Sequence, residues 1–361
     1  MPVEFIGWIA PRVSSEIIDG EGPAFSRDVI KHTAIVHEQA GFDRVLIGYF
    51  SNAPDGFLLG AHAGAHTERL GFLLAHRPGF VAPTVAARKL ATFDQLTEGR
   101  VAVHIISGGS PVDQARDGDY EDHGARYRRS AEYVDILKRV WTASEPFDHA
   151  GEFYQFEGAH TEVYCYQSPH IPVYGGGGSE DAVSTLSPGI DVFMLWGEPL
   201  AATAEFMRRV RDAARHNSIE FSLSTRPILA DTEGKAWDRA RDILKRIEAR
   251  LPNGAARPQN AGSLRLLDAA AEGEVHDSCL YTALAVATGA RGNSTALVGT
   301  PDTVAEALAC YYDIGAKTLL VRGYDPLPDA VQYGEELIPR VRALVAERDR
   351  ARASAADRPR P

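Results

Sequence analysis

The chain has 361 residues, of which 44% are hydrophobic and 24% are charged, as in a globular protein with one large core. Its formal net charge of −11 argues against a nucleic-acid partner, and no apolar run approaches the roughly 20 residues of a membrane span. The N-terminus lacks the basic region of a signal peptide, so we expect a cytoplasmic protein. The 3 cysteines form no close pair, so we expect neither a disulfide framework nor a zinc site.

Strands and helices are predicted to alternate along most of the chain. Apolar runs indicate strands at 3–9, 44–50, 70–75 and 101–106, and helical spacing of apolar residues indicates helices at 25–40, 56–67, 84–96 and 125–144. Alternating aromatic and polar residues at 147–167 predict an inserted β-hairpin. Further strands are expected at 172–175, 192–196, 220–229, 296–298 and 318–321, and further helices at 200–216, 233–251, 303–314 and 329–348.

This order predicts an α/β protein folded as a (β/α)8 TIM barrel with insertions in its βα loops. A doubly wound sheet would need a glycine-rich phosphate turn after the first strand, where the chain instead reads Ala10-Pro11-Arg12. We expect one barrel domain over 1–348 and a polar, frayed tail over 349–361. Residues 252–292 have the least regular pattern and are the candidate lid, because long irregular loops in compact domains are usually functional.

The most informative stretch is 77–109, RPGFVAPTVAARKLATFDQLTEGRVAVHIISGG. Together with the strand at 70–75 it forms one complete βαβ unit of a parallel sheet. Ser107, Gly108 and Gly109 follow its second strand, at the end where α/β barrels bind ligands.

Two further patterns suit an anion. His123 and Tyr127 lie four residues apart at the start of a helix, so they share one face. Gly177, Gly178 and Ser179 precede another helix, where successive free amide groups make an anion nest. From the residues alone, a helix cap and a plain turn explain these patterns equally well.

Other polar residues suggest no chemistry. The histidines at positions 62, 66, 76 and 104 converge on no metal site, and each is interpreted as structural. Asp113 and Asp117 have helical spacing and are expected on a solvated face.

Several separated motifs, in order, resemble the flavin-dependent luciferase-like monooxygenases and, within them, the two-component alkanesulfonate monooxygenases. The motifs span residues 3–348 and read RPGFVAPTVAARKLATFDQLTEGR, SGGSPVD, DHGARYRRSAEY, YGGGGSEDA, LWGEP, RGNSTALVGTP, RGYDPL and YGEELIP. The resemblance implies a TIM barrel that binds reduced FMN (FMNH2), supplied by a separate NAD(P)H-dependent flavin reductase. It also implies a homodimer or homotetramer that uses O2 to cleave the C–S bond of an organosulfonate, giving an aldehyde and sulfite.

The same resemblance implies roles for individual residues. The flavin phosphate would be bound by His123, Tyr127, Gly177, Gly178 and Ser179, with Ser107 beside the flavin. The sulfonate side would comprise Trp196, Arg226, Arg291 and Tyr324. Guanidinium groups suit a sulfonate because they supply directed donors to its three oxygens. Arg322, near the same strand end as Tyr324, is not assigned a role in the site.

Three departures from the family pattern leave the substrate open. A histidine of the alkanesulfonate enzymes is Ile228 here, their loop cysteine matches Ala53, and their histidine after the first strand is replaced near Pro11-Arg12. A sulfone or a sugar sulfonate is therefore an alternative substrate. A deazaflavin-dependent oxidoreductase of the same barrel and a non-catalytic flavin-binding relative are the alternative functions.

Overall fold

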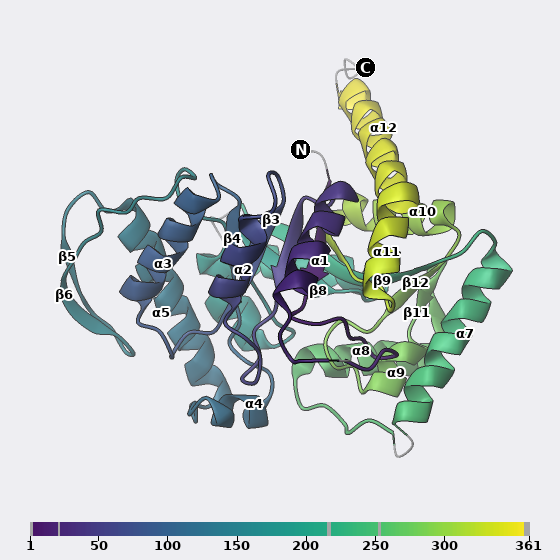
Figure 1. Ribbon diagram of the computed structural model, residues 1–361, viewed down its shortest axis with the longest axis horizontal. Helices are drawn as coiled ribbons and strands as arrows, with labels where there is room; N and C mark the ends of the chain where they lie inside the picture. Colours follow the sequence, from purple (N-terminus) through teal and green to yellow (C-terminus); the bar gives the residue numbers. More distant parts are fainter. Residues whose placement is uncertain (1–2, 21, 215–217, 252–253, 357–361) are drawn as a thin grey trace.

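The computed structural model describes residues 3–20, 22–214, 218–251 and 254–356. Within this part of the chain, eight parallel strands form a closed barrel surrounded by helices (Figure 1). The barrel strands are β1 (Glu4–Ile9), β2 (Arg44–Ile47), β3 (Gly71–His76), β4 (Val101–Ile105), β7 (Val173–Gly176), β8 (Val192–Trp196), β9 (Glu220–Leu229) and β13 (Ala316–Val321). The predicted (β/α)8 TIM barrel is therefore confirmed.

The barrel closes through pairing of its last strands. β13 pairs in parallel with both β1 and β9, and β9 also pairs in parallel with β8. Because all barrel strands are parallel, the loops that follow them gather at one end of the barrel. The helices α4 (Pro111–Arg116), α8 (Ala261–Glu272) and α9 (Ala283–Thr288) lie at this end, on the lower side of Figure 1.

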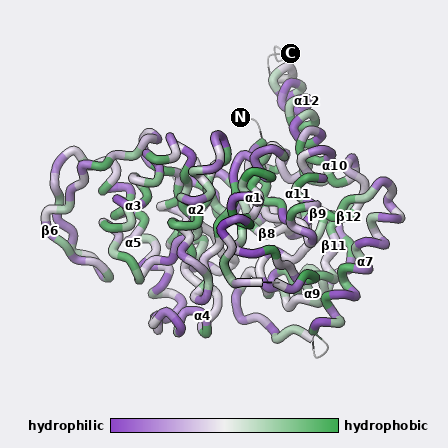
Figure 2. The backbone as a smooth tube through the Cα atoms, viewed as in Figure 1, coloured by the Kyte–Doolittle hydropathy of each residue, from purple (hydrophilic) through white to green (hydrophobic). Residues whose placement is uncertain are grey.

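The surrounding helices begin at local sequence signals. Ser26 caps α1 (Arg27–Gln39), Asp122 caps α5 (His123–Thr142) and Thr300 caps α10 (Pro301–Ile314), each through a side-chain oxygen that accepts a backbone N–H bond. The other surrounding helices are α2 (Gly56–Gly64), α3 (Pro83–Leu96), α6 (Leu200–Ala214), α7 (Glu233–Arg250), α11 (Pro326–Gln332) and α12 (Ile338–Ala356). Hydrophilic and hydrophobic segments alternate along α7 and α12 in Figure 2, as expected for helices with one face on the core. None of the described helices is long and apolar enough to cross a membrane.

One predicted strand lies outside the barrel. β12 (Ala296–Gly299) pairs with the second half of β9 and continues, antiparallel, to β11 (Leu280–Tyr281) and β10 (Val275–His276). β9 is 10 residues long, so its end projects beyond the barrel and supports this small sheet. Sequence periodicity does not separate this strand from the barrel strands, because both are short apolar runs.

The candidate lid, residues 252–292, is more regular than predicted. It contains α8, β10, β11 and α9, while residues 252–253 lie outside the described residues. Asn260 caps α8 by accepting the N–H bond of Ser263 at 2.8 Å, and Leu266 is fully buried under the helix. These elements are too short to give a clear apolar period in the sequence.

The predicted hairpin at 147–167 is confirmed over β5 (Phe147–Ala150) and β6 (Gln155–Ala159), at the edge of the molecule in Figure 1.

The tail at 349–361 is not frayed throughout, because α12 continues to Ala356 and Arg352 pairs with Asp313 of α10. Residues 357–361, and residues 215–216 of the predicted helix 200–216, lie outside the described residues. The predicted helix 329–348 is divided by one π-helical turn, Tyr333–Leu337.

The inside of the barrel is filled with side chains. Its apolar part includes Ile6, Leu73, Ala102 and Leu320. His104 lies two residues after Ala102 in β4 and therefore shares this interior, where its Nδ1 atom has no hydrogen-bond partner within the described part of the chain. Burial lowers the pKa of His104 to about 4, so it is neutral at physiological pH.

These observations predict how stability depends on pH. Burial also lowers the pKa of His37 and of His76 to about 4, whereas an unfolded histidine titrates near 6.5. The unfolded chain therefore binds more protons below pH 6.5, and the free energy of unfolding falls as the pH is lowered from 6.5 towards 4. Carboxylates add to this loss only below about pH 5, so the change in the free energy of unfolding between pH 6.5 and pH 5 comes from the histidines.

Replacing His37→Gln should reduce the pH dependence of the free energy of unfolding in this window by about a third, since one of three such histidines is removed. Urea unfolding at pH 7, 6 and 5 measures it. His32→Gln is the matched control, because His32 is exposed on the same helix. An unchanged dependence in His37→Gln would show that His37 does not contribute.

Candidate active site at the barrel mouth

The predicted site residues lie at the carboxyl end of the barrel, which we call the barrel mouth. Ser107 follows β4, the glycine–serine turn 177–179 follows β7, and Trp196 ends β8. Arg226 lies where β9 leaves the barrel, and Tyr324 comes shortly after β13. Strand ends of a closed barrel surround a common mouth, so residues distant in sequence are brought to one place.

The turn after β7 has the features of an anion site. Gly177 has φ of +149°, which favours glycine, and the amide groups of Gly178 and Ser179 have no acceptor among the described residues. The side chain of Tyr127 from α5 packs on the turn, with its hydroxyl against Gly177 and close to the Ser179 side chain. Burial raises the pKa of Tyr127, so the phenol keeps its proton.

His123 lies one helical turn before Tyr127 on the same face, with ring centroids 5.0 Å apart. Its Nδ1 atom is 2.8 Å from Oδ2 of Asp181. A protonated ring would donate to Asp181 through Nδ1 and present its Nε2–H group to a ligand. The predicted pair is therefore brought together beside the predicted turn.

These groups fit the phosphate of a flavin nucleotide. Two free amide groups, a hydroxyl and an imidazole surround a turn that has no side chains of its own at positions 177 and 178. A phosphate dianion needs such a set of donors and close backbone approach.

Ser107 is buried beside this turn but its polar atoms are already used. Its Oγ atom is 2.9 Å from Oγ of Ser130, and its carbonyl oxygen accepts hydrogen bonds from Gln114 and Arg126. Its carbonyl is therefore fixed by two donors from α4 and α5, which anchors the loop after β4.

The start of α8 lies directly against the turn and Trp196. A Cβ atom on Gly178 would lie 2.6 Å from the backbone nitrogen of Gly262, and a Cβ atom on Gly262 would lie 2.9 Å from the Trp196 ring. Both distances are too short for a side chain. The segment 254–292 thus covers the barrel mouth on the side of β7 and β8.

On the other side of the mouth, Arg226 and Tyr324 are in contact. The guanidinium of Arg226 lies 3.8 Å from the centre of the Tyr324 ring. It forms a two-point ion pair with Glu16, with both nitrogen–oxygen distances 3.0 Å. Glu16 comes from the loop after β1, and the arginine pair holds the pKa of this carboxyl well below its ordinary value despite burial.

Arg291 is not brought to this cluster. It is exposed in the loop between α9 and β12 and has no partner among the described residues. The residue before it, Ala290, packs with Leu266 and Trp196 in a small apolar cluster. Ile228, the position of the missing histidine, is buried in the extension beyond the barrel with Ile243 and Val298.

Sequence reasoning missed Glu16 and misplaced two aspartates. Asp113 and Asp117 do not lie on a solvated face, because both pair with Arg77 at the end of β3. Tyr49 donates to Asp117 at 2.9 Å and Ser51 donates to Asp113 at 2.6 Å. An arginine directly after an apolar strand was the available signal for this network, whereas Glu16 lies in an irregular loop with no signal of its own.

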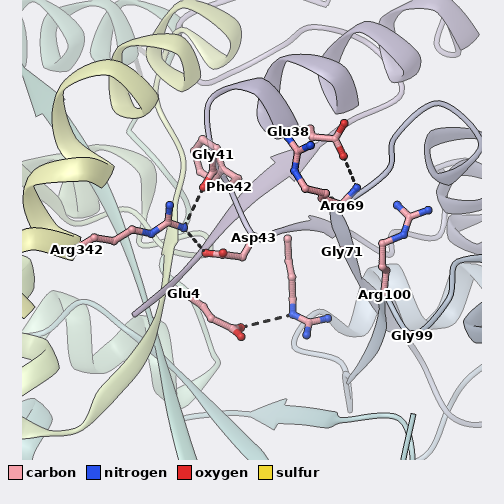
Figure 3. A pocket seen from close by; sticks show the side chains of 11 residues that line it. Glu4, Glu38, Gly41, Phe42, Asp43, Arg69, Gly71, Gly99, Arg100 and Arg342 are labelled. Atoms are coloured by element: carbon pink, nitrogen blue, oxygen red, sulfur yellow. Dashed lines mark hydrogen bonds and ion pairs between the residues drawn. The ribbon is translucent and has the colours of Figure 1, made fainter. Parts of the chain in front are cut away.

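A cavity of about 450 Å³ lies at the opposite end of the barrel (Figure 3). It is lined by residues at the starts of β1 to β4, and its charges are largely paired. Glu4 pairs with Arg44, and Asp43 pairs with Arg342. The amino end of such a barrel normally serves stability, so this cavity is a structural feature and the mouth is the candidate site.

The family comparison matches almost the whole chain. A sequence model of the family described as luciferase-like monooxygenase matches residues 3–318.

Solved structures with low sequence identity share the fold. EDTA monooxygenase from Chelativorans sp. BNC1 is 16% identical with a TM-score of 0.74, covering 95% of this chain and 94% of that chain. The oxygenating constituent of 3,6-diketocamphane monooxygenase from Pseudomonas putida, solved with FMN, is 20% identical with a TM-score of 0.70, covering 94% and 99%. An F420-dependent secondary alcohol dehydrogenase, solved with an F420–acetone adduct, is 15% identical with a TM-score of 0.65, covering 94% and 99%.

The glycine–serine turn predicts the effect of one methyl group. Gly177→Ala should weaken FMN binding about tenfold or more, because the new Cβ would overlap the Tyr127 hydroxyl and φ at this position is strained for alanine. Quenching of FMN fluorescence on titration with protein measures the dissociation constant.

Gly234→Ala is the matched control, since nothing lies within 4 Å of a Cβ at this exposed position of α7. Its FMN affinity should equal that of the unmodified protein. Equal affinity in Gly177→Ala, with an unchanged circular dichroism spectrum, would exclude the turn as the phosphate site.

Proposed function

The chain belongs to the luciferase-like monooxygenase family, and from this premise we propose that it is an FMNH2- and O2-dependent monooxygenase that cleaves the C–S bond of an organosulfonate. The observation that carries the proposal is the turn 177–179 with His123 and Tyr127, a donor set that suits a flavin phosphate at the barrel mouth. A related barrel that was solved with FMN supports the choice of cofactor.

The cations at the mouth support an anionic substrate. Arg226 lies where β9 leaves the barrel and Arg322 follows the neighbouring strand β13, so positive charge is concentrated here in a protein whose net charge is −11. A sulfonate has three acceptor oxygens that guanidinium groups bind with defined geometry. For a sulfonate R–CH2–SO3−, the products would be an aldehyde, bisulfite and water, with FMNH2 oxidised to FMN.

When bound, reduced FMN would supply the two electrons with which O2 yields one oxygen atom to the organic product and one to water. A separate NAD(P)H-dependent flavin reductase would deliver it. In this proposal the donors of the turn 177–179 orient the cofactor by its phosphate, and Trp196 with Gly262 excludes water from the mouth.

Tyr324 is the candidate proton holder at the site. Its hydroxyl is buried and has no hydrogen-bond partner among the described residues, and burial raises its pKa to about 12. The Oη–H group therefore stays protonated and is free to donate one hydrogen bond to an oxygen that gains charge during the reaction. Trp196 and Tyr324 form the substrate side, which Arg226 supports through its ion pair with Glu16, and Arg291 joins them when the segment 254–292 closes further over the mouth.

The closure of this segment is testable because Arg291 is an exposed trypsin site. Tryptic cleavage after Arg291 should slow several-fold when FMNH2 and a sulfonate are added under anaerobic conditions, since closure would bury this bond. Cleavage after Arg69, which is exposed at the amino end of the barrel, is the control and should not change. Equal slowing at both sites, or none, would rule out closure by this segment.

The activity itself is predicted to release sulfite. With a flavin reductase, FMN, NADH and O2, the protein should form sulfite and aldehyde in equal amounts from at least one member of a panel of alkyl, aryl and sugar sulfonates. Sulfite is measured with a thiol-exchange dye and the aldehyde by chromatography. If a neutral sulfone is oxidised and no sulfonate yields sulfite, the substrate is a sulfone and not a sulfonate. If the protein transfers hydride with a deazaflavin, the cofactor is a deazaflavin and not FMN.

A further inference from the structure

Arg226 has little capacity left for a substrate. All three of its guanidinium nitrogens donate within the protein, to both oxygens of Glu16 and to the carbonyl oxygens of Arg322 and Gly323. The Tyr324 ring covers one face, and 2% of the side chain is exposed. The charge of Arg226 is therefore matched by a carboxylate of the same chain.

Arg322 differs in each of these respects. One nitrogen, Nη2, donates to Glu16 at 2.8 Å. Its Nε and Nη1 groups have no acceptor among the described residues, and neither is fully enclosed. The side chain is 26% exposed and its guanidinium lies 5.1 Å from the centre of the Trp8 ring.

Arg322 lies at the barrel mouth. Trp8 is next to last in β1 and belongs with the residues that line the barrel interior. β13 and β1 are neighbours, so Arg322 lies over the same opening that Trp8 borders. A cation–π contact with an indole helps to hold the guanidinium in place and uses none of its N–H groups.

The charges of the cluster do not cancel. Arg226 and Arg322 bring two positive charges and Glu16 one negative charge, which leaves one positive charge. Since Arg226 is enclosed and saturated, the accessible donors that carry this charge belong to Arg322. A guanidinium edge with two free N–H groups is suited to two oxygens of one anion.

We propose that Arg322, placed over the Trp8 ring and held by Glu16, is the residue that receives the anionic group of the substrate, while Arg226 is the buried anchor of Glu16. This inference rests on the proposed function for the identity of the anion as a sulfonate. It makes Arg322 the determinant of preference for an anion over a neutral molecule of the same shape.

Binding is tested apart from turnover. Calorimetry on the FMN-loaded protein compares 1-butanesulfonate with the neutral methyl butyl sulfone. Arg322→Gln should weaken butanesulfonate binding roughly 10- to 100-fold, as expected for a lost hydrogen bond to a charged group, and leave sulfone binding unchanged. Arg322→Lys should recover part of the affinity, because it restores the charge without the fork.

Arg241→Gln is the matched control, since Arg241 is exposed on α7 and pairs only with Asp238 among the described residues. Its butanesulfonate affinity should equal that of the unmodified protein. Unchanged butanesulfonate affinity in Arg322→Gln, or no binding of this anion by the unmodified protein, would overturn the proposal. Equal losses for the sulfonate and the sulfone would also overturn it, because they would indicate a structural effect.

Turnover separates this inference from the proposed function. If the unmodified protein binds butanesulfonate through Arg322 but releases no sulfite from any sulfonate, desulfonation is wrong and the role of Arg322 stands. If sulfite is released and Arg322→Gln leaves KM for the sulfonate unchanged, desulfonation stands and the role of Arg322 is wrong.

Discussion

The ion pair between Arg226 and Glu16 is the constraint on which the barrel mouth depends. A charge removed from water must be paired and hydrogen-bonded, or it costs several kcal/mol. Arg226 meets this need with a carboxylate from the loop after β1 and two carbonyls after β13, so three neighbouring strand ends are tied to one side chain. The conformation of the loop around Glu16 and the placement of Arg322 follow from it. Loss of either partner would therefore alter the whole of this side of the mouth.

The two ends of the barrel use charge differently. At the amino end, arginines and acids from the first strands pair across an open cavity, where their attraction is weakened by water. At the mouth, the ion pair of Arg226 with Glu16 is more enclosed, and one guanidinium edge of Arg322 has no acceptor among the described residues. The extension of β9 adds to this asymmetry, because it supports a small sheet and two helices on the mouth side alone.

Much of the fold could be predicted from the sequence, because buried parallel strands such as 101–105 are continuous apolar runs and the helices have clear caps. The positions of Ser107 and the turn 177–179 at the barrel mouth could be predicted for the same reason, since each directly follows a buried strand. The parts that could not be predicted also have physical reasons. β12 has the same apolar pattern as a barrel strand, and only pairing distinguishes them. Glu16 and Arg322 could not be assigned from the sequence, because their role depends on a contact between residues 306 positions apart.

The contact between Gly178 and Gly262 has a consequence for how the sequence can vary. The two backbones touch without side chains between them, so the positions behave as a single steric unit although they belong to different elements. A methyl group on Gly178 would meet the backbone of Gly262 and force α8 away from the turn, whereas a methyl group on Gly262 would press on the Trp196 ring. Alanine at either position would therefore need a shift of α8, which makes the pair a marker for recognising chains that share this arrangement.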